Sequence, residues 1–456
     1  RGHPGDGGRL DLGRQGGGNA RHARRIPQGG GEGKRRWVAA GHLARDLGGK
    51  RASSYVSMAG CCGAAPADDF PSRRALLGRS TKDIPVMPNP SPATPAQAAT
   101  EPGLIAHSQQ PFNAEPSTDQ LRASFITPRH NFYVRSHGDI PHLDPAEHRL
   151  RVGGRVRAPL DLSLAELKDR FPPATVMATL QCAGNRRADM QRVRPVSGDP
   201  WAPGAIGNAE WTGVPLSAAL RAAGADEDAA LHVAFDSADE CSKNGKTFRY
   251  GASIPMAKAL GPEVLLAWAM NGDALRPEHG APLRVVVPGY AGVRSPKWLC
   301  AISVQDCPSD SPIQATDYKL FPPHVTEETA DPAAGMTINA MPLNSAICEP
   351  APHAQLPRGP ATLRGYATAS GRAVTRVDVS QDGGRTWLQA DFEDHPGSPW
   401  SWTFWRATLD LPKGEHDLVV RAWDEAGQTQ PAMPDDTWNF KGYLSAAWHR
   451  VPVSVG

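Results

Sequence analysis

The sequence predicts a mixed α+β domain followed by an all-β, immunoglobulin-like sandwich. In the first two thirds of the chain, short helix signals mix with β-prone runs without the regular strand–helix repeat of a parallel α/β fold. After about residue 320 the helix signals cease, and short alternating strands follow over about 130 residues. Pro and Gly number 44 and 46 of 456 residues, which indicates many turns and long loops.

Two helices are expected in the mixed region. Ser163 with Glu166 forms a capping box before an apolar stretch that stops at two prolines, 172 and 173. Residues 215–223 predict a short amphipathic helix closed by Gly224. The expected strands are a hairpin around a Gly-Gly turn at 150–156, a run at 175–180 that ends just before Cys182, and a buried run at 283–288.

The sandwich is predicted from alternation and turns. Residues 376–380 and 386–388 flank the turn 382–384 and predict a hairpin. Residues 401–409 and 417–423 predict two further strands. Several short strands with turn signals between them are typical of a two-sheet domain.

Charge and hydropathy limit the class of protein. Lys plus Arg number 49 and Asp plus Glu 47, so the balance does not indicate a nucleic-acid partner. No apolar run approaches the ~18–20 residues of a membrane helix, and we expect no membrane partner.

The N-terminal region has a different composition. Residues 1–51 hold 12 Lys/Arg, 4 Asp/Glu and 15 Gly, with too few apolar residues to form a core. A nucleic-acid-binding arm is the alternative, but Trp37 is its one aromatic residue. Residues 85–102 are rich in Pro and Ala and indicate a linker. We expect a disordered extension over 1–105, the mixed domain over 106–318 and the sandwich over 319–456.

Cys182 is the strongest candidate for chemistry among seven cysteines that form no CxxC pair. It lies in QCAGNRR (181–187), where a strand ends in a loop with a glycine and two arginines. Guanidinium groups nearby favour the thiolate, which binds soft transition metals and acts as a nucleophile. A small buried cysteine beside solvated arginines is the other interpretation, and these residues alone do not decide between the two.

A wider set of segments carries a resemblance. They are FYVRSH (132–137), TLQCAGNRR (179–187), GAIGNAEW (204–211), YGASIP (250–255), AMNG (269–272), HGAPLRVVVPG (279–289), KWL (297–299), VDVS (377–380) and AWHR (447–450). In this order they resemble the molybdenum domain of eukaryotic sulfite oxidases, particularly the plant type, and the match spans most of residues 120–456.

The resemblance implies a molybdenum–molybdopterin cofactor. Cys182 would be the thiolate ligand to molybdenum, and fixed polar groups would hold the pterin and its phosphate. The matching cofactor-binding positions are Tyr133, Val134, Arg135, Ser136, His137, Cys182, Asp239, His279, Arg284, Ser295, Pro296 and Lys297.

The resemblance also implies an anion pocket. Sulfite would lie among Arg135, Arg187 and Arg450, with Trp201 as an apolar wall, because a compact oxyanion needs several converging cations. At one position the sequence departs from the family, which has tyrosine where this chain has Trp268. The family tyrosine lines the substrate pocket, so we expect Trp268 to alter turnover.

The implied activity is the oxidation of sulfite to sulfate by a homodimer that associates through its C-terminal sandwich. The electron acceptor would be dioxygen or a separate carrier, since no haem-binding segment is recognised. One alternative is the molybdenum domain of a nitrate reductase, which shares the CAGNRR loop. Another is a non-catalytic relative whose sandwich acts as a binding module. Plant-type relatives are peroxisomal, so we expect the peroxisome, with the mitochondrion and the cytoplasm as alternatives.

Overall fold

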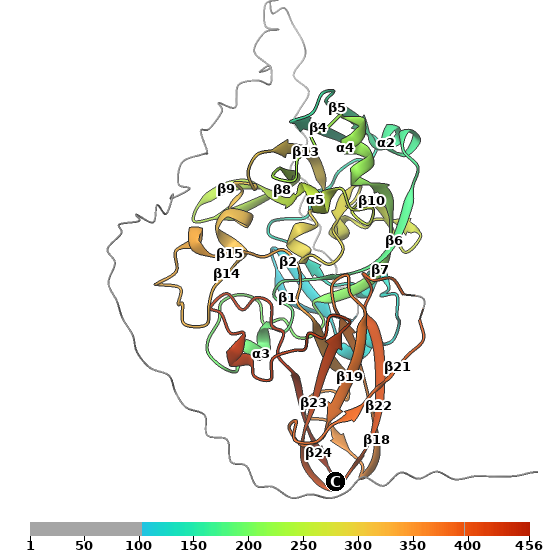
Figure 1. Cartoon of the computed structure of the whole chain (residues 1–456), viewed down its shortest axis with the longest axis vertical. Helices are drawn as coiled ribbons and strands as arrows, with labels where there is room; N and C mark the ends of the chain where they lie inside the picture. The colour runs from blue at the N-terminus through green and yellow to red at the C-terminus, as the bar shows by residue number, and fades with distance from the viewer. Residues whose placement is uncertain (1–102, 396) are drawn as a thin grey trace, which may run out of the picture. The chain divides into compact units, whose positions relative to one another are not determined.

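The computed structural model describes residues 103–395 and 397–456 (Figure 1). The disorder expected for residues 1–105 concerns mostly residues outside this part of the chain. Residues 104 and 105, which were expected in that extension, lie in a strand instead. No helix within the described residues is long and apolar enough to cross a membrane.

A small antiparallel sheet begins the described chain. It has the order β1-β2-β3, with β1 at Leu104–Gln109, β2 at Phe112–Pro116 and β3 at Val134–Arg135. Asn113 on β2 is paired with Arg135 on β3 in the register. This sheet therefore positions one of the predicted anion-binding arginines.

Two five-stranded sheets form the body of the mixed domain. One has the order β11-β10-β7-β6, with β12 also paired to β10. Its strands are β6 (Ala174–Gln181), β7 (Ile206–Pro215), β10 (Leu265–Met270), β11 (Asp273–Ala274) and β12 (Arg284–Val286). The other has the order β5-β4-β13-β8-β9. Its strands are β4 (Arg149–Gly154), β5 (Leu160–Ser163), β8 (His232–Lys243), β9 (Lys246–Pro255) and β13 (Leu299–Gln305).

The hairpin predicted around residues 153 and 154 is wrong. Strand β4 ends at Gly154, pairs in parallel with β13, and finds its antiparallel partner only at β5. Gly154 has φ +80°, and an added Cβ would lie 2.2 Å from the carbonyl oxygen of Val304. Gly154 therefore serves a close approach to β13 rather than a two-residue turn.

The helices are short. They are α1 (Thr118–Arg122), α2 (Leu164–Arg170), α3 (Arg187–Gln191), α4 (Leu216–Ala222) and α5 (Met256–Ala259), with 3₁₀ turns at 129–131, 277–279, 292–294, 332–334 and 434–436 and a π-helical turn at Ile313–Asp317. The capping box of α2 is confirmed, because Ser163 accepts from the N–H of Glu166 and Glu166 accepts from the N–H of Ser163. The helix predicted at 215–223 is confirmed as α4.

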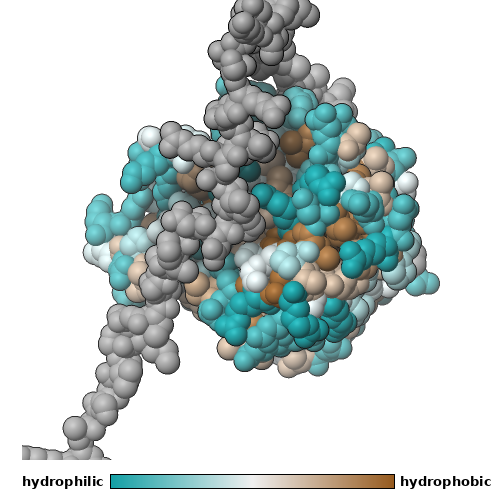
Figure 2. Space-filling view, turned by 90° about the horizontal axis from the view of Figure 1, so that it is seen from above, coloured by the Kyte–Doolittle hydropathy of each residue, from teal (hydrophilic) through white to brown (hydrophobic). Residues whose placement is uncertain are grey.

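The largest core cluster lies between the helices and the two sheets. Leu167 of α2 and Leu220 of α4 pack with Val233 of β8, Leu266 of β10 and Val285 of β12. All five side chains are fully buried. Figure 2 shows the end of the molecule that carries these helices, where hydrophobic residues gather in the middle of a largely hydrophilic face.

The C-terminal part is a two-sheet sandwich, reached through the strand pair β14 (Lys319–Leu320) and β15 (Met336–Thr337). One sheet has the order β16-β18-β22-β21, with β16 at Asn344–Glu349, β18 at Gly359–Thr368, β21 at Asp391–Phe392 and β22 at Thr403–Leu411. The other has the order β17-β24-β23-β19-β20, with β17 at Gln355–Leu356, β19 at Val374–Ser380, β20 at Leu388–Gln389, β23 at Gly414–Asp424 and β24 at His449–Val455. The predicted hairpin is confirmed, since Val379 of β19 pairs with Leu388 of β20.

The mixed region and the sandwich are joined by a buried aromatic cluster. Leu121 of α1 and Ile206 of β7 pack against three aromatic residues of the sandwich. These are Tyr366 on β18, Trp402 just before β22 and Phe404 on β22. The Tyr366 hydroxyl donates to the carbonyl oxygen of Pro203 at 3.0 Å. The predicted fold class, a mixed α+β domain followed by a β-sandwich, is confirmed, and the two parts are packed through a common core.

Candidate active site

The loop after β6 holds Cys182 in a buried position. The N–H of Cys182 donates to the carbonyl oxygen of Ala205 at 2.9 Å, and the Cys182 side chain is 5% exposed. The N–H of Gly184 lies 3.4 Å from Cys182 Sγ. A Cβ at Gly184 would lie 2.8 Å from Nη2 of Arg187, so the glycine allows the arginine to approach the thiol.

Only one of the two arginines in this loop faces the thiol. Arg186 is fully buried and pairs with Asp189 of α3. Its guanidinium also donates to Asn344 and to the carbonyl oxygen of Ala447 on the sandwich side. Burial raises the pKa of the Cys182 thiol, and Arg135 and Arg187 oppose that rise in part. The expected depression of the pKa by the arginine pair is therefore outweighed by desolvation.

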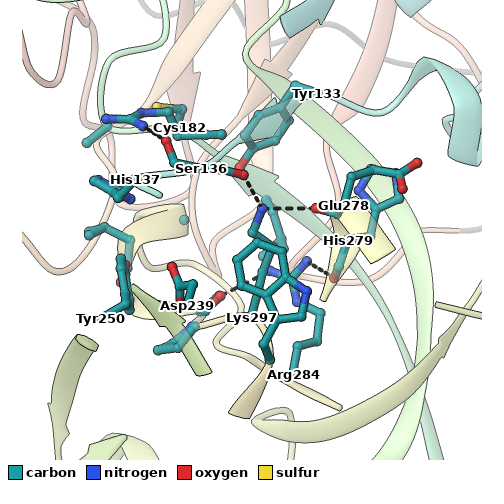
Figure 3. Close-up of a pocket in the computed structure, with 18 of the residues that line it drawn as sticks. Tyr133, Ser136, His137, Cys182, Asp239, Tyr250, Glu278, His279, Arg284 and Lys297 are labelled. Carbon is teal, nitrogen blue, oxygen red and sulfur yellow. Dashed lines mark hydrogen bonds between the residues drawn. The ribbon is translucent and has the colours of Figure 1, made fainter. Parts of the chain in front are cut away.

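A cavity with about 660 Å³ of open space lies beside Cys182 (Figure 3). It is lined by Tyr133, Arg135, Ser136, His137, Cys182, Asp239, His279, Arg284, Ser295, Pro296 and Lys297, together with further residues that include Tyr250, Glu278 and Tyr318. The structure thus brings together eleven of the twelve predicted cofactor-binding residues. Val134 is the exception, because its side chain packs with Phe112 and Ala114 instead.

The cations of this inner cavity are held by neutral groups. Arg284 donates to the carbonyl oxygens of His279 and Ser295 at 2.9 and 3.1 Å. Lys297 Nζ donates to Ser136 Oγ and to the carbonyl oxygen of Glu278 at 3.0 and 2.9 Å. Burial lowers the pKa of Arg284 to about 10 and that of Lys297 to about 7. Such cations retain the capacity to bind an anionic group.

Acceptors and a neutral imidazole complete the inner wall. Burial raises the pKa of Asp239 to about 6, and its Oδ1 atom is buried without a hydrogen-bond partner. Burial lowers the pKa of His279 to about 3, and its Nε2 lies 2.9 Å from the carbonyl oxygen of Arg129. The donor set fits a pterin with a phosphate group, since two buried cations suit the phosphate and an unpaired carboxylate oxygen suits ring N–H donors.

A second, open cavity adjoins the first and forms its mouth. Arg135, His137 and Tyr318 line both. The mouth also contains Arg187, Asp199, Asp317, Lys441 and Tyr443. Within the described residues, no carboxylate forms an ion pair with Arg135, Arg187 or Lys441. Arg135 donates to Asn113 and Ser136, and Arg187 donates to the carbonyl oxygens of Gly442 and Asp199. This cluster of cations is arranged to receive an oxyanion.

Family models and curated relatives both match this chain to molybdenum-dependent oxidoreductases. The oxidoreductase molybdopterin binding domain matches residues 137–313, and the Mo-co oxidoreductase dimerisation domain matches residues 335–456. A curated chicken sulfite oxidase is 44% identical over 380 residues, which cover 81% of this chain and 82% of the relative. An Arabidopsis sulfite oxidase is 38% identical and covers 78% of this chain and 95% of the relative. The chain belongs to the sulfite oxidase family.

Membership of the sulfite oxidase family shows that the cofactor is molybdenum–molybdopterin. A solved structure of the sulfane dehydrogenase SoxCD from Paracoccus pantotrophus has a TM-score of 0.66 and 26% identity, and the match covers 81% of this chain and 93% of that one. A barley nitrate reductase is also 38% identical, but the match covers only 41% of its length. The likeness to sulfite oxidases therefore extends over a larger share of the relative.

Arg450 does not lie at the site where the sulfite oxidase resemblance placed it. It is on β24, where it donates to Asp417 Oδ2 at 2.6 Å and to the carbonyl oxygen of Gly383. It lines neither cavity. The third cation at the mouth is Lys441, nine residues earlier, from the loop that precedes β24.

Trp268 is also placed elsewhere. Side chains on β10 alternate, so Leu265 and Ala267 face the cluster that contains Cys182, while Leu266 and Trp268 face the large core on the other side. The Trp268 ring lies 5.3 Å from Lys168 Nζ of α2. The expectation that Trp268 replaces a pocket tyrosine is therefore wrong, and Tyr318 is the tyrosine that lines both cavities.

Trp201 supports the Cys182 loop from behind rather than forming a cavity wall. It is fully buried, packs in the same cluster as Cys182 and lines neither cavity. Its Cδ1 would lie 3.1 Å from a Cβ at Gly184. Sequence reasoning missed Tyr318, Lys441 and Tyr443. The only sequence signal for the last two is their position in NFKGYLS (439–445), just before the AWHR segment that carries the resemblance.

Proposed function

We propose that the protein oxidises sulfite to sulfate at a molybdenum–molybdopterin centre that Cys182 ligates through its thiolate. The observation that carries the proposal is a group of cations, Arg135, Arg187 and Lys441, at the mouth of the cavity that contains Cys182. None of the three forms an ion pair with a carboxylate of residues 103–395 or 397–456. A small, multiply charged oxyanion matches that arrangement. The sulfite oxidases of chicken and Arabidopsis support the same substrate.

The inner cavity would hold the cofactor. Arg284 and Lys297 would bind its phosphate, and Asp239 would accept from ring N–H groups of the pterin. When bound, the molybdenum centre supplies the two-electron oxidation of sulfite with oxygen transfer to sulfur. Overall, sulfite and water yield sulfate, two protons and two electrons. The side chains of the protein would orient the anion and donate a hydrogen bond to it.

Arg135, Arg187 and Lys441 would orient the anion so that its sulfur faces the Cys182 end of the cavity. His137 Nε2 and the Tyr318 hydroxyl lie 2.8 Å apart. Burial keeps the pKa of His137 well below its usual value and raises that of Tyr318, so both groups are neutral at pH 7. With His137 donating, the Tyr318 hydroxyl keeps its own proton for a sulfite oxygen.

The experiment is to purify the protein, measure its molybdenum content, and assay sulfite-dependent reduction of ferricyanide beside nitrate reduction by a chemical donor. We expect about one molybdenum per chain and sulfite as the faster substrate. Faster turnover of nitrate would favour the nitrate reductase alternative. A folded protein without molybdenum would favour a binding module. The placement of Cys182 in the inner cavity and of Arg187 in the adjoining mouth, with Arg135 lining both, argues against the latter.

The chain would also act as a homodimer through residues 335–456, in line with the dimerisation domain that matches there. Light scattering of the whole protein tests this.

The acceptor would be dioxygen or a separate carrier, and formation of one hydrogen peroxide per sulfite would identify dioxygen. For the compartment, we retain the peroxisome from the plant resemblance. A rat relative is a mitochondrial sulfite oxidase, so cell fractionation must separate peroxisome, mitochondrion and cytoplasm.

A further inference from the structure

Tyr443 is held at the mouth of the site by a loop from the sandwich side. Its N–H donates to Asn439 Oδ1 at 3.0 Å, and Asn439 Nδ2 donates back to the carbonyl oxygen of Tyr443 at 2.8 Å. The next residue, Leu444, donates its N–H to the carbonyl oxygen of Ala183, which follows Cys182. The backbone of Tyr443 is thus fixed both within its own loop and against the loop of the expected metal ligand.

The ring of Tyr443 lies between two groups of the anion site. It stacks on Tyr318 with ring centroids 4.9 Å apart and an interplanar angle of 17°. The Arg187 guanidinium carbon lies 5.3 Å from the centroid of the Tyr443 ring. Aromatic stacking and the cation–π contact therefore hold Tyr318, Tyr443 and Arg187 as one unit.

Gly442 allows this close approach. Its φ is +63°, and a Cβ there would lie 2.6 Å from Cγ of Arg187. Its carbonyl oxygen accepts from Arg187 Nε at 3.3 Å. The segment Lys441–Tyr443 therefore places a cation, a backbone acceptor and an aromatic ring against the mouth in three consecutive residues.

We propose that Tyr443 is a specificity-determining residue that limits the anion site to compact oxyanions. Its ring occupies the space beside Tyr318 and Arg187 that an organic substituent on sulfur would need. Under this limit a trigonal oxyanion of the size of sulfite would lie beside the ring, whereas the aryl group of an aryl sulfonate would compete with the ring for the same place. This inference rests on the proposed function and deepens it by naming the size limit of the substrate class.

The test compares the holoenzymes of the wild type, Tyr443→Ala and Tyr443→Phe. Sulfate and benzenesulfonate are used as competitive inhibitors of sulfite oxidation, because the phenyl group of benzenesulfonate matches the ring that Tyr443→Ala removes. We expect Tyr443→Ala to bind benzenesulfonate at least about tenfold more tightly, while sulfate weakens by about threefold to tenfold through loss of stacking and of the cation–π contact. Tyr443→Phe keeps the ring and should retain the wild-type preference.

A parallel shift of both inhibitors in Tyr443→Ala would overturn the proposal, because a merely structural role moves both in the same direction. Loss of the size limit in Tyr443→Phe would also overturn it. Calorimetric titration of the oxidised holoenzyme with the same two anions measures the selectivity without turnover. A wild type that does not oxidise sulfite but still excludes benzenesulfonate would therefore refute the proposed function and leave the size limit standing. If Tyr443→Ala does not fold, Tyr443→Leu replaces it, with molybdenum content and melting temperature as checks.

Discussion

The inner cavity and its mouth are built in different ways. The inner cavity is enclosed by segments that carry recognisable motifs, and its cations, Arg284 and Lys297, are fixed by backbone carbonyl oxygens and by Ser136. The mouth combines Arg135 and Arg187 with Lys441, which lies in a loop about 300 and 250 residues further along the chain, respectively. Motifs identify the part of a site that binds a conserved chemical group, whereas the part that selects the substrate depends on how distant segments are packed.

The largest effect is expected at Cys182, in the inner cavity next to the mouth. Cys182→Ser should lower sulfite oxidation by more than about 100-fold, since changes behind a metal ligand alone cost about 10–100-fold. A serine hydroxyl is a harder and far less acidic ligand than a thiol. We expect the pterin content to remain near that of the wild type, because the inner cavity is unchanged. Activity close to wild type would remove Cys182 from the metal.

The mouth alone is tested by Arg187→Ala. We expect kcat/KM for sulfite to fall by about 100-fold, because a desolvated charge that binds an ion typically accounts for about 2–5 kcal/mol on truncation. Molybdenum and pterin contents should not change. Arg192→Ala, in which a 59% exposed arginine of the next turn is removed, is the matched control and should stay within about twofold. Equal losses in both variants would mean that the effect is general electrostatics.

The identity of the third cation is tested by comparing Lys441→Ala with Arg450→Ala. Lys441→Ala should lower kcat/KM by about tenfold, as expected for one charged hydrogen bond to substrate. Arg450→Ala should change it by less than about twofold, because Arg450 is bound to Asp417 on the sandwich. The reverse ranking would return Arg450 to the anion site and contradict the placement of Lys441.

The smallest effect should lie outside both cavities, at the joint between the two parts. Burial, with Arg186 nearby, lowers the pKa of His449 to about 3, and its Nδ1 accepts from the N–H of Ile347. Because the folded pKa is below the unfolded value, its contribution to stability is present above about pH 6.5 and decreases as the pH falls toward 3. The slope is at most about 1.4 kcal/mol per pH unit. Melting temperatures of His449→Gln should therefore vary less than those of the wild type between pH 6.5 and 4.5, and an equal slope would contradict this assignment.

Sequence signals predicted the fold correctly where the local conformation depends on residues close together in the chain. The capping box of α2, the strand that ends before Cys182 and the β19–β20 hairpin depend on neighbouring residues. The two-residue hairpin at Gly154 failed because β4 continues to Gly154 beside β13, whose paired residues lie about 150 positions later, and turns back only at β5. Glycine in that position indicated a turn, whereas its role is contact with a distant strand.

The positions of the site residues were likewise predictable where they lie in recognisable motifs, and not where they depend on strand orientation or on a distant loop. The inner residues follow motifs that preserve their order and spacing, and eleven of the twelve positions that the resemblance implies line one cavity. Trp268 was misplaced because a resemblance between segments does not say which face of β10 a side chain occupies, and the alternation of Leu265, Leu266 and Ala267 decides that. Lys441 was missed because AWHR, a few residues later, offered a more obvious arginine.

The hydrogen bond from the Leu444 N–H to the carbonyl oxygen of Ala183 determines when, during synthesis, the mouth of the site can be completed. The last residue that lines the inner cavity is Tyr318, so every residue of that cavity is made before the strands of the sandwich. The mouth cannot form until residue 443 has emerged and the last loop has docked on the Cys182 loop. The residues proposed to hold the cofactor are therefore all made before Lys441 and Tyr443, the last residues of the mouth through which substrate would enter.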